Sequence, residues 1–220
     1  MAEQPLTPFD TFAREYDAWY ESPYGASVLQ REVECLRPLL QPTGRALEVG
    51  VGTGRFAVPL GIAHGVDPSL PMLRMAAGRG IVSVCGVGEM LPYRDGVFDA
   101  VLLAASLEFV AHARRVLEEA RRTLRDDGTL VVGIINRESA WGGAYQQMAT
   151  QGDPIFSQAR FWTAQEAMLL GEAAGFSFVR ARSTLLGPPF VIAEPDSREG
   201  AVAEAGFVAI AFRKREEETS

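Results

Sequence analysis

The chain has 220 residues, of which 47% are hydrophobic and 22% are charged, and its formal net charge at pH 7 is −7. This length and composition are typical of a globular protein, and we expect residues 1–220 to form a single domain. The acidic balance disfavours nucleic acid as a partner, because proteins that grip several phosphates usually present a basic face.

The scarce residue types exclude several kinds of protein. No apolar run reaches the roughly 20 residues that a membrane span needs, and residues 1–5 lack the pattern of a signal peptide, so we expect a cytoplasmic protein without membrane contact. The only lysine is Lys214, which excludes a pyridoxal Schiff base, a phosphate-loop lysine and the Tyr-x-x-x-Lys pair of short-chain dehydrogenases. The two histidines and two cysteines do not cluster, so we expect no metal.

Residues 9–40 are predicted to form a helical cap segment. The periodicity over 27–40 predicts an amphipathic helix, which Pro42 and Gly44 are expected to end. Its inward positions are Val28, Val33, Leu36 and Leu40. The stretch 9–24 before this helix is rich in aromatic side chains, namely Phe12, Tyr16, Trp19, Tyr20 and Tyr24.

A glycine loop follows the first predicted strand, which covers residues 45–49. Gly50, Gly52 and Gly54 permit backbone angles and close approaches that a Cβ atom would forbid. A ligand can therefore lie against main-chain N–H groups at the start of the helix predicted over 54–60.

An acid ends the second predicted strand, over 62–67. The carboxylate of Asp67 can accept hydrogen bonds from two vicinal ribose hydroxyls, although Asp-Pro-Ser is also a good helix N-cap and both roles can coexist. The loop spacing is G-x-G-x-G, whereas a pyrophosphate-binding fingerprint is G-x-G-x-x-G and would need glycine where Arg55 stands. The spacing favours a nucleoside that lacks a pyrophosphate.

The rest of the chain continues the alternation of strands and helices. Strands are predicted near 81–85, 98–104 and 129–135, and helices near 69–77 and 111–124. Another helix is predicted over 163–174, followed by strands over 176–184 and 206–212 with no helix between them. The alternation predicts an α/β fold with a doubly wound, mostly parallel sheet.

At these motifs the chain resembles the class I S-adenosylmethionine-dependent methyltransferases, most closely the small members called methyltransferase type 11. Residues 48–54 look like the family's first motif, and residues 66–69 look like its ribose-binding motif. Residues 86–93 with Phe98-Asp99 are similar to the loop beside the adenine, and residues 120–130 are similar to the helix, turn and fifth strand. The resemblance runs over nearly the whole chain. Val87 departs from it, because many relatives carry an Asp there to accept from the adenine amino group.

The resemblance implies a seven-stranded sheet with an antiparallel C-terminal edge strand, S-adenosylmethionine as cofactor and S-adenosylhomocysteine as product. It gives Glu48 the role of holding the loop and the cationic amino group of the cofactor. Residues 12–17 look like the segment that folds over the cofactor. The cofactor-binding residues that it implies are Tyr16, Glu48, Gly50, Val51, Gly52, Gly54, Asp67, Pro68, Gly88, Glu89, Met90, Ala104 and Ala105.

Residues 136–162 are predicted to form a substrate-side insertion. So long a connection in a compact domain is usually a lid or substrate loop, and the alternative is a small apolar cluster under a surface excursion. Bends are expected at 142–143 and 152–154. Together with the aromatic stretch 9–24, this insertion should meet the carboxyl ends of the strands, where doubly wound sheets bind ligands. The substrate-side residues proposed on this basis are Tyr20, Trp141, Tyr145 and Phe161.

The implied reaction needs little covalent help, because the sulfonium already activates the methyl group and positioning dominates. Candidates for a catalytic base are His112, Glu108 and Tyr16, and the sequence does not choose among them. The Asn-Pro-Pro-Tyr type of motif is absent from 104–107, which disfavours methylation of DNA adenine or protein glutamine.

The sequence therefore predicts a methyltransferase acting on a small molecule of apolar or aromatic character, as a monomer or homodimer. Two alternatives stay open at this point. One is a protein that binds S-adenosylmethionine without catalysis, and the other is an NAD(P) oxidoreductase.

Overall fold

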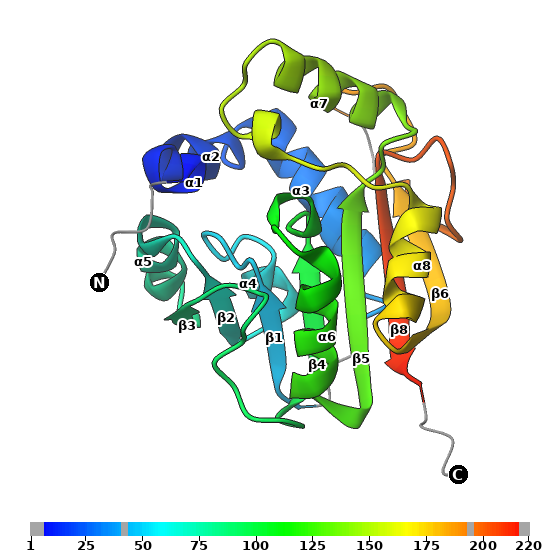
Figure 1. Cartoon of the computed structure of the whole chain (residues 1–220). Coiled ribbons are helices and arrows are strands. Elements are labelled where there is room, and N and C mark those ends of the chain that lie inside the picture. Colours follow the sequence, from blue (N-terminus) through cyan, green and yellow to red (C-terminus); the bar gives the residue numbers. More distant parts are fainter. Residues whose placement is uncertain (1–6, 41–43, 193–195, 216–220) are drawn as a thin grey trace.

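The structure, a computed structural model, describes residues 7–40, 44–192 and 196–215. Its centre is one eight-stranded sheet in the order β3-β2-β1-β4-β5-β8-β6-β7 (Figure 1). The strands are β1 (Ala46–Val49), β2 (His64–Asp67), β3 (Val82–Cys85), β4 (Phe98–Ala104), β5 (Leu124–Ile135), β6 (Phe176–Thr184), β7 (Arg198–Glu199) and β8 (Phe207–Lys214).

Strand directions confirm the predicted fold class. β1 to β5 pair in parallel, and β8 is antiparallel to both of its neighbours, β5 and β6. The sheet has eight strands instead of the expected seven, because Arg198 and Glu199 pair with β6 as the short strand β7. The antiparallel C-terminal strand lies between β5 and β6 and not on the edge of the sheet. Its buried run 207–212 is apolar on both faces, which suits a central strand better than an edge.

Helices cover both faces of the sheet. In Figure 1, α6 and α8 lie in front of the sheet and α3 lies behind it. Two apolar cores result: Val101 and Leu103 of β4 pack toward α6, whereas Ala100 and Leu102 pack toward α3. The helices are α1 (Pro8–Thr11), α2 (Ala13–Trp19), α3 (Pro23–Leu36), α4 (Ala57–Leu60), α5 (Leu70–Gly78), α6 (Ala113–Thr123), α7 (Ala140–Thr150) and α8 (Ala164–Ala173), with 3-10 turns η1 (Leu107–Phe109) and η2 (Phe156–Gln158).

The boundaries of α3 differ from the sequence prediction. Ser22 caps the helix by accepting a hydrogen bond from the Gly25 backbone N–H, and Pro23 occupies the first turn, so α3 begins four residues before the predicted start at Ser27. The helix ends at Leu36: Arg37 still has helical dihedral angles, but Pro38 has no backbone N–H with which to continue the helical hydrogen bonds. Pro42, to which the sequence assigned this end, lies outside the described residues.

The insertion 136–162 contains a helix. Ser139 caps α7 by accepting from the Gly142 backbone N–H at 2.9 Å, so the bend predicted at 142–143 is wrong and both glycines lie inside α7. Gly152 has φ +86° just after the helix, and there the chain does turn. Figure 1 shows α7 above the carboxyl ends of the strands, on the same side as α1 and α2. No helix in the described part of the chain is long and apolar enough to cross a membrane.

Candidate active site

A cavity of about 710 Å³ opens at the carboxyl ends of β1, β2 and β4. This volume falls within the range of ordinary small-molecule pockets. Of the residues predicted to bind the cofactor, eleven line it: Tyr16, Glu48, Gly50, Val51, Gly52, Asp67, Pro68, Gly88, Glu89, Ala104 and Ala105. The other two, Gly54 and Met90, are not among its lining residues.

The glycine loop has a backbone that other residues would adopt with strain. Gly50, Gly52 and Gly54 have φ values of +77°, +51° and +85°. A Cβ atom on Gly50 would lie 2.6 Å from the Cβ of Ser106. A Cβ on Gly52 would have no atom of the chain within 4 Å, so the backbone of Gly52 faces open space.

Asp67 is held beside this loop by two backbone hydrogen bonds. Its Oδ2 accepts from the Gly52 N–H at 2.9 Å, and its Oδ1 accepts from the Ser69 N–H at 2.8 Å. Each oxygen keeps a further lone pair with which to accept from a ligand. Ser69 is the N-cap of α5, so Asp67 fixes the turn before the helix without capping it. Burial raises the pKa of Asp67 above its ordinary value, and the two N–H donors only partly oppose the rise.

Glu48 places at the same cavity a buried side-chain oxygen without a hydrogen-bond partner in the described part of the chain. The residue is 1% exposed, and its Oε2 has no hydrogen-bond partner among the described residues. Burial raises the pKa of Glu48 well above its usual range, and the nearby charge of Asp67 raises it further. A buried carboxylate oxygen without a donor is costly, and a cationic group on a ligand would remove that cost.

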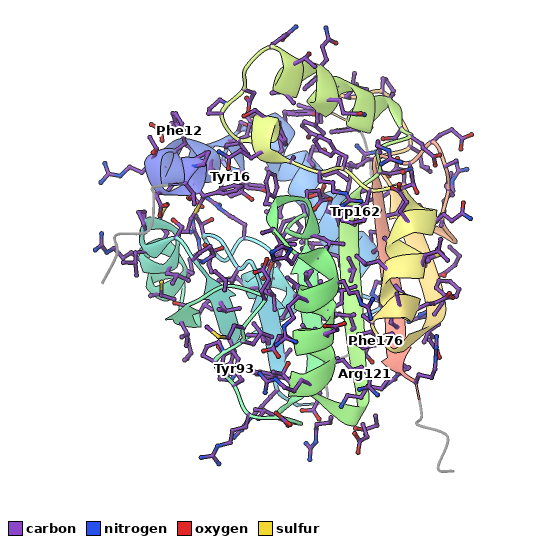
Figure 2. All side chains as sticks on the ribbon, viewed as in Figure 1. Phe12, Tyr16, Tyr93, Arg121, Trp162 and Phe176 are labelled. Atoms are coloured by element: carbon purple, nitrogen blue, oxygen red, sulfur yellow. The ribbon has the colours of Figure 1, made fainter. Side chains whose placement is uncertain are left out.

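The N-terminal segment closes over the cavity through side chains that the sequence analysis did not single out. The Phe9 ring packs edge-on against Phe109 at 5.0 Å between centroids, and the Phe9 carbonyl accepts from the Ser69 hydroxyl at 3.3 Å. Both phenylalanines line the cavity. Figure 2 shows Tyr16 pointing from α2 toward the middle of the molecule.

Asp17 anchors α2 to two distant parts of the chain. Arg55 donates to both of its carboxylate oxygens, at 2.8 and 2.6 Å, and Arg79 donates to Oδ2 at 2.8 Å. Arg79 also donates to the Thr53 carbonyl of the glycine loop at 2.8 Å. Burial alone would raise the pKa of Asp17, but the hydrogen bonds from the two arginines outweigh it and hold that pKa well below the usual range. Arg55 therefore links α2 to the glycine loop. In the sequence, its bulk served only to exclude a dinucleotide fingerprint.

Known proteins match this chain over most of its length. The family model described as a methyltransferase domain matches residues 47–132. An uncharacterized protein of Mycobacterium tuberculosis is 43% identical over 202 residues, which are 90% of this chain and 70% of that protein. An uncharacterized protein of Methanocaldococcus jannaschii is 37% identical over 95% of this chain and 100% of its own length. A crystal structure from Thermotoga maritima, described as a SAM-dependent methyltransferase and possible histamine N-methyltransferase, is 37% identical, has a TM-score of 0.88 and covers 94% of this chain and 98% of its own.

The chain belongs to the class I S-adenosylmethionine-dependent methyltransferase family. The cavity fits the cofactor of this family on three counts. The loop at Gly52 leaves room for a ligand against the backbone, Asp67 has lone pairs for a sugar diol, and Glu48 has an oxygen that lacks a cation.

Gly88, at the lining of the methyltransferase cavity, packs closely against the apolar core. A Cβ on Gly88 would lie 3.0 Å from side-chain carbons of both Val116 and Val49, so a larger residue there would push into the core. Val87 lines the cavity with an apolar side chain. Met90 is 73% exposed and is not among the lining residues.

The three candidate bases of the methyltransferase lie in different surroundings. His112 is exposed at the start of α6, where its backbone N–H donates to Glu89 Oε1 at 3.0 Å and its side chain makes no capping hydrogen bond. Tyr16 lines the cavity, and its hydroxyl lies 3.0 Å from that of Tyr20. Glu108 is 1% exposed; its Oε1 accepts from the Ile135 N–H at 2.7 Å, and its Oε2 has no partner among the described residues. Burial raises the pKa of Glu108 to about 7.

The substrate-side residues divide into two groups. Trp141 is 1% exposed, donates to the Gly187 carbonyl at 2.9 Å and belongs to the core on the α3 side of the sheet. Phe161 is also buried and stacks on Tyr145. Tyr20 lies beside Tyr16, with 3.0 Å between their hydroxyl oxygens. None of the four predicted residues is among those that line the cavity, and the insertion supplies apolar packing at Trp141.

Glu32, which is 7% exposed on α3, was not among the residues predicted from the sequence. Burial raises its pKa to about 8, and the charge of Glu108 also raises it against the opposing effect of Arg31. A signal was present in the sequence: Glu32 shares a helical stripe with the inward residues Val28 and Leu36, four residues away on either side.

Proposed function

We propose that this protein transfers the methyl group of S-adenosylmethionine to a small organic acceptor. The observation that carries the proposal is the presence, in one cavity, of the buried Glu48 Oε2 without a partner in the described chain, the Asp67 carboxylate and the open glycine loop. The family membership supports the choice of cofactor over NAD(P).

Each residue of the cavity then has a separate task. Glu48 would hold the amino group of the cofactor, and Asp67 would accept from its ribose hydroxyls. Gly88 and Glu89 would contact the adenine through their backbone. Phe9, Phe109 and Tyr16 would exclude water from the reacting atoms. When bound, S-adenosylmethionine supplies a methyl group that its sulfonium has already activated, so the protein contributes mainly by holding an acceptor in line with it.

The names of the relatives do not agree on an acceptor. The Thermotoga maritima protein is described as a possible histamine N-methyltransferase, and relatives that match shorter stretches are named a demethylmenaquinone methyltransferase and a malonyl-[acyl-carrier protein] O-methyltransferase. These are three different acceptor chemistries. We propose that the acceptor of this protein lies between α2 and the insertion 136–162, next to Tyr16.

Calorimetric titration with S-adenosylhomocysteine tests the cofactor site. The wild-type protein should bind it, and Asp67→Ala and Glu48→Gln should each weaken binding at least about tenfold, because each removes a charge-assisted interaction. Asp126→Ala is the control, since that carboxylate lies in solvent beside Lys214. Unchanged binding in both cavity variants would overturn the site assignment.

Catalysis needs a separate readout. A protein that only binds S-adenosylmethionine would form no S-adenosylhomocysteine with any acceptor, whereas a transferase forms it with at least one member of a broad panel of small amines, phenols, thiols and carboxylic acids.

A further inference from the structure

Five side chains with ionisable groups gather beside the cofactor cavity, and we call them the Tyr-Glu cluster: Tyr16, Tyr20, Glu32, Glu108 and Tyr145. They come from α2, α3, η1, α7 and the residue that follows α2. Tyr16 belongs to the cluster and also lines the cavity, and Phe109, next to Glu108, lines it too. The cluster therefore adjoins the place where an acceptor must approach the cofactor.

The two carboxyl groups of the cluster lack counter-charges. Glu108 Oε2 is buried without a hydrogen-bond partner, and no described residue donates a hydrogen bond to the side chain of Glu32 or forms an ion pair with either glutamate. The nearest cation, Arg31, is already bound by Asp196, with Nη2 to Oδ2 at 2.5 Å and Nε to Oδ1 at 3.4 Å. Two buried carboxyls without a cation favour a ligand that brings one.

Besides burial, the charge of Glu32 contributes to raising the pKa of all three tyrosines of the cluster. Burial raises the pKa of Tyr16 to about 12, and the charges of Glu32, Glu48 and Asp67 raise it as well. Tyr16 also lines the same cavity as Glu48 and Asp67. Burial and then the charge of Glu32 also raise the pKa of Tyr145. The Tyr16 and Tyr20 rings meet edge to face at 5.3 Å between centroids. Tyrosine faces and hydroxyl oxygens both attract cations.

We propose that the methyl acceptor is a small organic amine, which binds as its ammonium ion between Glu32 and Glu108 and against the rings of Tyr16, Tyr20 and Tyr145. One of the two carboxylates would take a proton from the ammonium ion. The nitrogen lone pair freed in this way would bond to the methyl carbon as the bond from that carbon to sulfur breaks, which leaves S-adenosylhomocysteine and the N-methylammonium ion. The inference rests on the proposed function, because it places the amine beside the cofactor. The same cluster disfavours an acceptor that carries a carboxylate, since a third negative charge would be buried beside two unpartnered carboxyls.

Calorimetry on the protein saturated with S-adenosylhomocysteine tests the inference. The probes are matched sets of one shape and three charges: 2-phenylethylamine, 2-phenylethanol and 3-phenylpropionate, with a second set built on a butyl chain. The amine of at least one set should bind at least about tenfold more tightly than its alcohol, and the carboxylate should bind most weakly.

Glu32→Gln and Glu108→Gln should each reduce the preference for amine over alcohol to about twofold or less, because each removes a carboxyl that can pair as a carboxylate with the ammonium ion, while keeping the shape and, at Glu108, an oxygen for the Ile135 N–H. Glu34→Gln is the matched control, since Glu34 lies on the same helix and bonds Gln30 at the surface. It should bind all probes as the wild type does.

Three outcomes distinguish a failure of this inference from a failure of the proposed function. Binding of S-adenosylhomocysteine with no amine preference in either set would overturn this inference alone. An amine preference that survives in both glutamine variants would overturn it too, because the amine would then bind elsewhere. Failure of S-adenosylhomocysteine to bind would overturn the proposed function and, with it, this inference.

Discussion

Buried glutamates set how the stability of the free protein depends on pH. Burial raises the pKa of Glu108 to about 7 and that of Glu32 to about 8, and it raises the pKa of Glu48 as well. Below pH 4.5 these groups are protonated in both the folded and the unfolded chain. Above it, the unfolded chain loses protons that the folded chain keeps, so the free energy of unfolding falls as pH rises toward the folded pKa values.

Urea unfolding of the free protein at pH 5, 6 and 7 measures this effect. In Glu32→Gln the free energy of unfolding should fall less steeply with pH, by about 1.4 kcal/mol per pH unit, because one titrating carboxyl is gone. Glu34→Gln should keep the wild-type slope. Equal slopes in the wild type and Glu32→Gln would show that Glu32 does not titrate in this range.

The site residues that could be predicted from the sequence differ in kind from those that could not. Gly52 and Asp67 were predictable from the sequence, because the glycine spacing and the acid at a strand end are local patterns that indicate a ligand site on the backbone. Glu32 and the Asp17 tie were not singled out, because their roles depend on partners brought together from other segments, such as Glu108 and Arg79. Local patterns report local structure, and pairings between segments need the fold.

At the scale of elements, α7 carries two adjacent glycines with opposite surroundings. A Cβ on Gly142 would lie 2.3 Å from the Asn136 carbonyl oxygen and 2.8 Å from the Cα of Arg137. A Cβ on Gly143 would meet nothing within 4 Å. Gly142 thus lets the start of α7 pack against the end of β5, and Gly143 has no such role.

Gly142→Ala should lower the free energy of unfolding by about 1–3 kcal/mol, because backbone must move to admit the methyl group. Gly143→Ala should raise it by about 0.5–1 kcal/mol, because alanine loses less backbone entropy than glycine in a helix. Chemical denaturation of the two variants beside the wild type measures both. A similar effect of both substitutions would contradict the placement of this helix.

The insertion also shows where sequence patterns for elements fail. Adjacent glycines usually mark a bend, but here the Ser139 cap and the packing of Trp141 against Gly206 hold the segment helical. Most strands were predicted close to their positions, because buried parallel strands are short apolar runs, but β5 begins at Leu124 and not at the predicted residue 129. The extra strand β7 was missed, since two residues carry no periodicity.

At the scale of the whole molecule, one carboxylate joins three separate regions. Asp17 ties the N-terminal helices to the glycine loop through Arg55 and to the end of α5 through Arg79. The cover of the cavity and its floor are therefore connected by ion pairs that are mostly shielded from water.

Asp17→Asn should lower the free energy of unfolding by about 1–3 kcal/mol, because it weakens hydrogen bonds between charged groups. It should also speed amide hydrogen exchange over residues 8–19 and the dissociation of S-adenosylhomocysteine. Glu21→Gln is the control, since Glu21 pairs with the same Arg55 at 2.9 Å but is largely exposed, and it should cost less than about 1 kcal/mol. Unchanged exchange in Asp17→Asn would mean that packing alone holds the N-terminal helices.

During synthesis, the sheet stays in two parts until β8 has emerged from the ribosome and can pair with both. β5 and β6 do not pair with each other; each pairs with β8, which is made after both. While residues 207–214 are still inside the exit tunnel, the nascent protein presents two open strand edges, and such edges invite aggregation. During synthesis these two edges should therefore stay exposed to aggregation until β8 has emerged and paired with both.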